Sequence, residues 1–138
     1  MVHRNRTPNE YSGQKAGKAM VAILLAEDDD SMRRFLKKAL ERAGHDVVDT
    51  SQGDEALTEL QLREFDLLLT DIVMPVMDGI ELARRAAEID PDMKIMFITG
   101  FAAVALNAQE QSMEDATVLS KPFHLRDLVN EIDRVLAA

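Results

Sequence analysis

The fold of this chain is decided by residues 24–30, which read LLAEDDD, an apolar run that ends abruptly in acids. Three later runs have the same form: LLLT at 67–70 precedes Asp71, IMFI at 95–98 precedes Thr99, and ATVLS at 116–120 precedes Lys121. Short apolar runs between amphipathic segments predict a buried parallel sheet. All carboxyl ends of such a sheet lie along one edge, where ligands bind. We therefore expect three acids, a hydroxyl and an amine to converge there.

The segments between these runs have helical periodicity. We expect helices over about 31–43, 54–63, 80–89 and 102–111, and a final helix that begins near Leu125. Asp30 or Ser31 is the expected N-cap of the first helix. The residues expected to form its apolar stripe are Met32, Phe35, Leu36, Ala39 and Leu40. With a short strand at 47–48, the pattern predicts an α/β fold: a doubly wound, flavodoxin-like parallel sheet of five strands in the order 2-1-3-4-5.

Length and composition limit the classes of protein. The 138 residues suit one domain, expected over 21–138. Residues 1–20 are polar and aperiodic, and we expect them to be a disordered leader or a tail added before an original start at Met20. The net charge is -9, which disfavours binding of nucleic acid by the folded part. The chain has no cysteine and no apolar run long enough to cross a membrane or to act as a signal peptide. These features favour a cytoplasmic protein, and we expect it to be a monomer.

The convergent acids predict a metal site. Glu27, Asp28 and Asp71 repel one another unless a cation or a proton compensates their charge. A few carboxylate ligands suit Mg²⁺. A plain polar cap on the first helix is the simpler alternative for 27–30, but it leaves Asp71 unexplained. An EF-hand loop is excluded, because the required Gly and final Glu are missing. We expect His3, His45 and His124 at the surface or its boundary.

Four motifs carry a resemblance to a known family. Residues 24–30, DIVMPVMDG at 71–79, ITG at 98–100 and KPF at 121–123 match, in order and spacing, the receiver domain of response regulators. The resemblance implies that Asp71 accepts a phosphoryl group, and that Mg²⁺ binds Glu27, Asp28, Asp71 and the backbone carbonyl of Val73. It also implies that Thr99 and Lys121 contact the phosphoryl oxygens and that Gly100 leaves room for them.

Three positions depart from the family's usual pattern. Many receivers carry an aromatic switch residue where this chain has Val118, and Phe101 is the candidate to take part of that role. Val73 and Phe101 also occupy the positions that tune hydrolysis of the acyl phosphate. Neither side chain can orient a water molecule, so slow autodephosphorylation is expected.

The resemblance also implies protein partners. A histidine kinase or histidine phosphotransferase would donate the phosphoryl group. Output would be by protein contact, and residues 23–36 resemble stand-alone receivers that serve as adaptors of the ClpXP protease, which makes ClpX a candidate target. The expected partner surface comprises Ala102, Val104, Leu106, Val118 and Phe123.

Other functions remain open at this stage. Related single-domain receivers relay phosphate or act on flagellar motors. A haloacid-dehalogenase-like phosphatase would also use an Asp and Mg²⁺, but it needs a second Asp where this chain has Val73. A pseudo-receiver that only binds partners would not need the full acceptor set.

Overall fold

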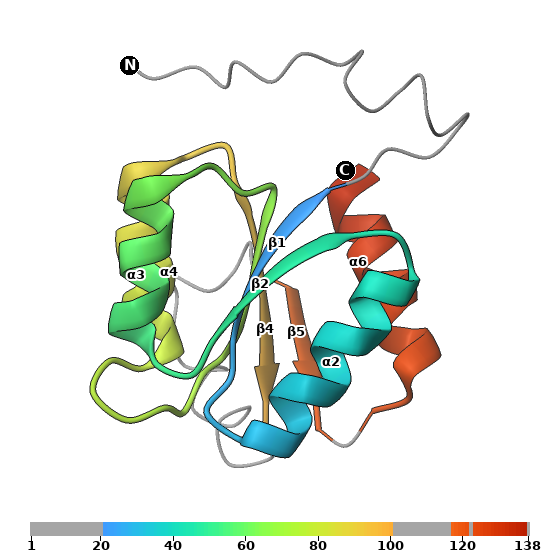
Figure 1. The fold of residues 1–138 in the computed structure, drawn as a ribbon. Coiled ribbons are helices and arrows are strands. Elements are labelled where there is room, and N and C mark those ends of the chain that lie inside the picture. Colours follow the sequence, from blue (N-terminus) through green and yellow to red (C-terminus); the bar gives the residue numbers. More distant parts are fainter. Residues whose placement is uncertain (1–20, 101–116, 122, 138) are drawn as a thin grey trace.

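A computed structural model describes residues 21–100, 117–121 and 123–137 of the chain. These residues form one parallel five-stranded sheet in the order β2-β1-β3-β4-β5, which confirms the predicted fold class and strand order (Figure 1). The strands are β1 (Ala22–Ala26), β2 (Asp46–Thr50), β3 (Leu67–Asp71), β4 (Lys94–Thr99) and β5 (Thr117–Ser120).

Within residues 21–100 and 123–137, four helices cover the two faces of the sheet. On one face lie α2 (Asp30–Arg42) and α6 (Leu125–Ala137), and on the other lie α3 (Gly53–Leu62) and α4 (Gly79–Ile89) (Figure 1). The helix expected over 102–111 lies outside the described residues. No helix within the described ranges is both long and apolar enough to cross a membrane.

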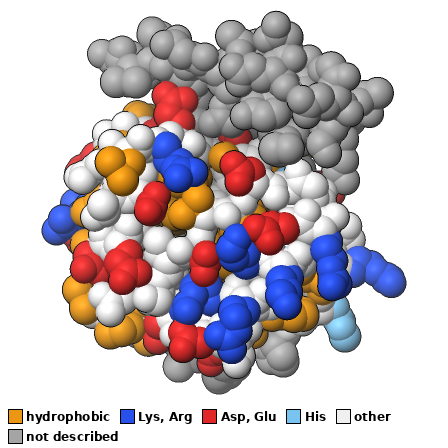
Figure 2. Space-filling model, viewed as in Figure 1, with side chains coloured by type: hydrophobic (Ala, Val, Ile, Leu, Met, Phe, Trp, Pro, Cys, Tyr) orange, Lys and Arg blue, Asp and Glu red, His pale blue; other side chains and the backbone are white. Residues whose placement is uncertain are grey.

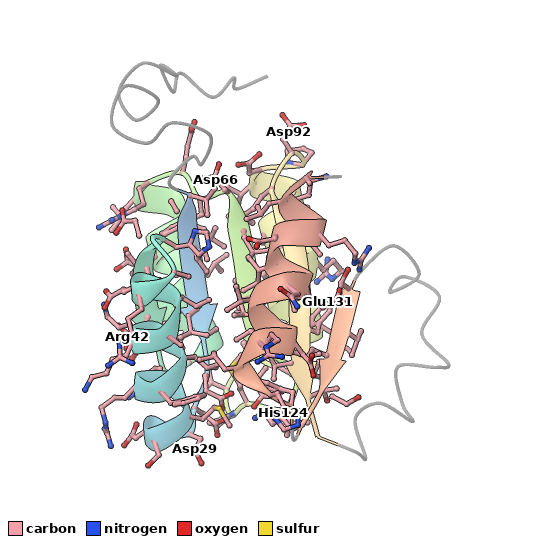
Figure 3. All side chains as sticks on the ribbon, turned by 90° about the vertical axis from the view of Figure 1, so that its right-hand side faces the viewer. Asp29, Arg42, Asp66, Asp92, His124 and Glu131 are labelled. Atoms are coloured by element: carbon pink, nitrogen blue, oxygen red, sulfur yellow. The ribbon has the colours of Figure 1, made fainter. Side chains whose placement is uncertain are left out.

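The strand register aligns the carboxyl ends of β1, β3, β4 and β5. Ala26 of β1 pairs with Thr70 of β3, Asp71 pairs with Ile98 of β4, and Thr99 pairs with Ser120 of β5. The residues that follow these strands therefore emerge at the same edge of the sheet. Figure 3 shows the two ends of the molecule: Asp29 and His124 lie at this carboxyl edge, and Asp66 and Asp92 lie at the opposite edge.

Alternation along the strands divides the core between the two faces. Leu25 and Leu36 belong to the cluster under α2 and α6, whereas Leu24 and Leu82 belong to the cluster under α3 and α4. All four side chains are fully buried, and each contributes about 1.5–3 kcal/mol of transfer free energy. The sheet that supports the carboxyl edge is therefore anchored on both sides.

Three local expectations were wrong. The N-cap of α2 is Asp29, whose carboxylate accepts a hydrogen bond from the Met32 amide at 2.8 Å. Phe35 is 50% exposed, because it lies beyond the edge of the narrow stripe that α2 buries. His45 is buried, since Gly44 turns the chain back with a φ of 99° and lets the His45 amide donate to a carbonyl in the last turn of α2.

Candidate functional site

Three carboxylates meet at the carboxyl edge of the sheet. One carboxylate oxygen from each of Glu27, Asp28 and Asp71 lies within 4.8 Å of the others. Glu27 and Asp71 are buried, whereas Asp28 is exposed to solvent. Glu27 and Asp28 follow β1, and Asp71 ends β3, so the pairing of these two central strands brings the acids together. The structure therefore has an acidic pocket that is open to solvent on one side.

Lys121 bridges two of these acids. Its Nζ lies 3.0 Å from Oδ2 of Asp71 and 3.1 Å from Oε1 of Glu27. The amide of Lys121 donates a hydrogen bond to the carbonyl of Thr99 at 2.7 Å, so the chain leaving β5 is fixed to the end of β4. Lys121 thus brings a positive charge into the pocket from an element almost a hundred residues away from Glu27.

The electrostatics of the pocket are those of an acid cluster with incomplete compensation. Burial and the neighbouring charge of Asp71 raise the pKa of Glu27 to about 7. Burial lowers the pKa of Lys121, but its hydrogen bonds and attraction to Asp71 and Glu27 outweigh burial and raise it. One lysine cannot neutralise three carboxylates. A bound cation would relieve the remaining repulsion, and few, hard oxygen ligands beside open solvent suit Mg²⁺.

Hydrogen bonds hold the turn that carries Glu27 and Asp28. The Glu27 amide donates to the carbonyl of Thr50 at 3.1 Å, and the Asp29 amide donates to Oε2 of Glu27 at 3.1 Å. The guanidinium of Arg33 donates to the Glu27 carbonyl at 2.9 Å. Sequence reasoning missed both Thr50 and Arg33.

The loop after Asp71 is packed tightly against its backbone. The amide of Val73 donates to Oδ1 of Asp71 at 3.2 Å, and the amide of Gly79 donates to the carbonyl of Ile72 at 2.7 Å. A Cβ at position 79 would lie only 2.0 Å from the Asp71 carbonyl oxygen. In the loop between Asp71 and Gly79, Val76 has a φ of 71°, a left-handed conformation that is rare for a β-branched residue.

Thr99 and Gly100 lie at the same edge. Thr99 is fully buried, and its hydroxyl donates to the Gly100 carbonyl at 3.3 Å. A Cβ at Gly100 would meet no atom of the described residues within 4 Å, so these residues leave the space beside it open. The structure therefore brings Thr99, Gly100 and Lys121 to the edge that holds the three acids.

The remaining sequence-predicted residues divide into two groups. Val118 is partly buried against a small cluster that contains Phe97, and Phe123 is partly buried against the core under α2 and α6. The other candidate switch and partner residues lie outside the described residues: Phe101, Ala102, Val104 and Leu106.

Comparison with known proteins identifies the family to which this fold and site belong. Residues 23–133 match the response regulator receiver domain, and the chain belongs to that family. Receiver domains are regulators of two-component systems rather than metabolic enzymes. They are phosphorylated on an aspartate and typically bind Mg²⁺ at an acidic pocket. The family assignment therefore favours a regulator over the phosphatase considered from the sequence.

Individual relatives narrow the assignment further. The chain is 69% identical to the response regulator receiver protein CpdR of Brucella abortus, over 86% of this chain and 99% of that protein. It is 34% identical to the sensor kinase CckA of the same organism, over 83% of this chain but only 12% of the kinase. The chain is closely related to CpdR, as the resemblance of residues 23–36 to stand-alone receivers suggested.

Solved structures share the fold. A response regulator receiver protein from Sinorhizobium medicae superposes with a TM-score of 0.78 at 34% identity, covering 86% of this chain and 96% of that one. The chemotaxis response regulator CheY4 of Vibrio cholerae gives a TM-score of 0.75 at 28% identity, covering 85% and 99%. Both likenesses place this chain in the CheY-like receiver fold.

Proposed function

We propose that Asp71 of this chain is the phosphoryl acceptor and that its phosphorylation switches contacts with a protein partner. The observation that supports the proposal most is the meeting of Asp71 with Glu27, Asp28 and Lys121 in one pocket. Asp71 ends the central strand β3, and its Oδ2 lies 3.0 Å from the only cation among the described residues that contacts it. A carboxylate so placed is a nucleophile whose charge is already partly balanced.

This arrangement supports the following transfer. An oxygen of Asp71 attacks the phosphorus of a phosphohistidine on a histidine kinase or phosphotransferase; an O–P bond forms, the N–P bond breaks, and the imidazole leaves with a proton. Lys121 then pairs with a phosphoryl oxygen instead of the free carboxylate. Thr99 supplies a hydroxyl, and the open space beside Gly100 accommodates the group.

The acidic pocket fits a magnesium ion. Glu27, Asp28 and Asp71 would hold it, together with the backbone carbonyl of Val73. A bound Mg²⁺ supplies charge that offsets the phosphoryl oxygens during transfer. The excess of carboxylates over the single lysine, and the raised pKa of Glu27, support a cation at this place.

Acetyl phosphate tests the acceptor directly. Incubated with acetyl phosphate and MgCl₂, the wild-type chain should gain the mass of one phosphoryl group, whereas Asp71→Asn should gain none. Asp92→Asn is the matched control, because Asp92 lies at the opposite edge of the sheet (Figure 3). Full labelling of Asp71→Asn would place the phosphate elsewhere and overturn the proposal.

We propose that the phosphorylated state of this chain is long-lived. Val73 is 65% exposed beside Asp71 and has no polar atom with which to orient an attacking water. Phe101, the second such position, lies outside the described residues. The double substitution Val73→Asn with Phe101→Glu should shorten the lifetime of the phosphoprotein, measured by intact mass after the donor is removed. An unchanged lifetime would contradict this part of the proposal.

For the output we propose a CpdR-like adaptor role toward the ClpXP protease, with a phosphate relay as the alternative. Its support is the 69% identity to CpdR and the resemblance of residues 23–36. Residues 21–138 would then act as the receiver unit. Fluorescence anisotropy with labelled ClpX should show tighter binding of unphosphorylated than of phosphorylated chain. A relay would instead return the phosphoryl group to a histidine phosphotransferase.

A further inference from the structure

Arg33 makes three contacts near the acidic pocket, each from a different nitrogen. Its Nη1 donates to the backbone carbonyl of Glu27 at 2.9 Å, and its Nη2 donates to Oδ1 of Asp30 at 2.7 Å. Its Nε lies 3.3 Å from Oδ2 of Asp49 on β2. The side chain is 15% exposed, so a planar guanidinium is held in one orientation between β1, α2 and β2.

These contacts bear on the turn that carries two of the three acids. The carbonyl of Glu27 belongs to the peptide group that joins Glu27 to Asp28, so Arg33 fixes the orientation of that peptide. The Glu27 amide is held on the other side by the carbonyl of Thr50 at 3.1 Å. The hydroxyl of Thr50 donates to the Leu25 carbonyl at 3.0 Å, which fixes the end of β1 before the turn.

We propose that Arg33 is a positioning residue for the metal site: by anchoring the Glu27–Asp28 peptide to β2, it sets the affinity of the acidic pocket for Mg²⁺. The proposal rests on the proposed function, because it assumes that this pocket binds the ion. Arg33 itself carries no ligand atom and acts only through the turn. Residues that orient metal ligands typically contribute tenfold to a hundredfold in metal affinity.

The sign of the effect distinguishes positioning from simple electrostatics. Arg33 is a cation near a cation site, so its charge alone repels Mg²⁺. Removing that charge without disturbing the turn would make Mg²⁺ bind more tightly. Losing the anchor of the Glu27–Asp28 peptide would make Mg²⁺ bind more weakly, because the two carboxylates would no longer be held toward Asp71.

The test is a titration of the full chain with MgCl₂ by isothermal calorimetry. Arg33→Met keeps an unbranched side chain about as long as the stem of arginine but removes the charge and all three contacts. Arg33→Lys keeps the charge but not the three-pronged geometry. Arg34→Met is the matched control, because it removes the same charge from the same helix. Arg34 is exposed and forms no ion pair within the described part of the chain. Urea unfolding followed by circular dichroism reports the stability of each variant.

Positioning predicts that the dissociation constant for Mg²⁺ rises about tenfold in Arg33→Met and in Arg33→Lys, and stays the same or falls slightly in Arg34→Met. An unchanged or lower dissociation constant in folded Arg33→Met would overturn the proposal, even if that variant were less stable, since a purely structural role lowers stability alone. If Arg33→Met does not fold, Arg33→Lys decides in the same way. Absence of saturable binding by wild type would refute the metal site itself, and with it this inference.

Discussion

Replacing Gly79 by alanine is expected to destabilise the protein, although helix propensity alone predicts the opposite. Gly79 is the first residue of α4, directly after the N-cap Asp78. Within a helix, alanine is more favourable than glycine by about 1 kcal/mol. Helix propensity therefore does not explain a glycine at the first position of α4.

The atoms around Gly79 decide whether alanine stabilises or destabilises the protein. A Cβ at this position would lie 2.0 Å from the carbonyl oxygen of Asp71 and 2.9 Å from Cα of Ile72, where ordinary contact begins at 3.4 Å. Both neighbours are backbone atoms, so no side chain can rotate to relieve the overlap. Either the start of α4 or the end of β3 must move. Overpacking of this kind costs about 3 kcal/mol, which leaves a net loss of about 2 kcal/mol after the gain in propensity.

Urea unfolding measures this loss, and a second glycine provides the control. A Cβ at Gly100 would meet nothing within 4 Å in the part of the chain that the structure describes, so Gly100→Ala should leave the free energy of unfolding almost unchanged. Because the overlap is with the carbonyl oxygen of Asp71, Gly79→Ala should also slow phosphorylation by acetyl phosphate. A Gly79→Ala variant as stable as wild type would show that the close approach to Asp71 is not a constraint, and the reasoning would be refuted.

Three further substitutions test separate features. Val76→Gly should raise the free energy of unfolding by about 0.5–1 kcal/mol, because relief of the left-handed backbone at valine (about 1–2 kcal/mol) exceeds the cost of the extra chain entropy of glycine. Val76 is 77% exposed, so little packing is lost with its side chain. A variant no more stable than wild type would contradict the backbone strain. Thr50→Val should lose about 1 kcal/mol in the same assay, since its buried hydroxyl donates to a β1 carbonyl; a neutral result would show that this bond is dispensable. Hydrogen bonds from Arg84 and Arg85 lower the pKa of Glu81 to about 2 from a normal 4.5. The ionised carboxylate of Glu81 therefore stabilises the fold fully above pH 4.5, and this contribution is lost as the pH falls toward 2. The Tm difference between wild type and Glu81→Gln should therefore narrow between pH 5 and pH 3, and a constant difference would exclude this ion pairing as its cause.

The sequence predicts the sheet because the signal is local and repeated. Four of the five strands are short apolar runs, and each of these runs is followed at once by a polar or charged residue, such as Glu27 or Asp71. The rules of parallel sheets then convert these ends into one edge. The observed strands end at Asp71, Thr99 and Ser120, which is at the end of each apolar run or one residue beyond it.

Surface and turn details were less predictable, because they depend on tertiary packing. Spacing alone places Phe35 in the apolar stripe of α2. Which side chains of the stripe become buried depends on how the helix lies on the sheet. Figure 2 shows the mixture of acidic and basic side chains on the face that α2 and β2 present. The burial of His45 was not predicted for a similar reason: the expected helix over 31–43 ends before it, but the path of the chain through Gly44 buries the next side chain.

Arg33 shows what a closer reading of the sequence could have found. Side chains on an α-helix lean toward its N-terminus. An arginine in the first turn of α2 therefore reaches back toward the residues just before the helix, where Glu27 and Asp28 lie. The spacing of a basic residue five positions after Asp28 was thus a usable signal, although the contact with Asp49 requires the pairing of β1 with β2.

The position of Asp71 is determined by backbone contacts that no motif reveals. Its carbonyl is in close approach to Gly79, and the amide of Gly79 donates to the carbonyl of Ile72, so the loop closes on the strand from which it leaves. Lys121 holds the carboxylate from the other side, at 3.0 Å. Any movement of the Asp71 backbone must therefore move either the first turn of α4 or the chain after β5. The residue types of the site can be read from the sequence, but their fixed geometry arises from this closure, which explains why a single methyl group at position 79 is expected to affect both stability and phosphorylation.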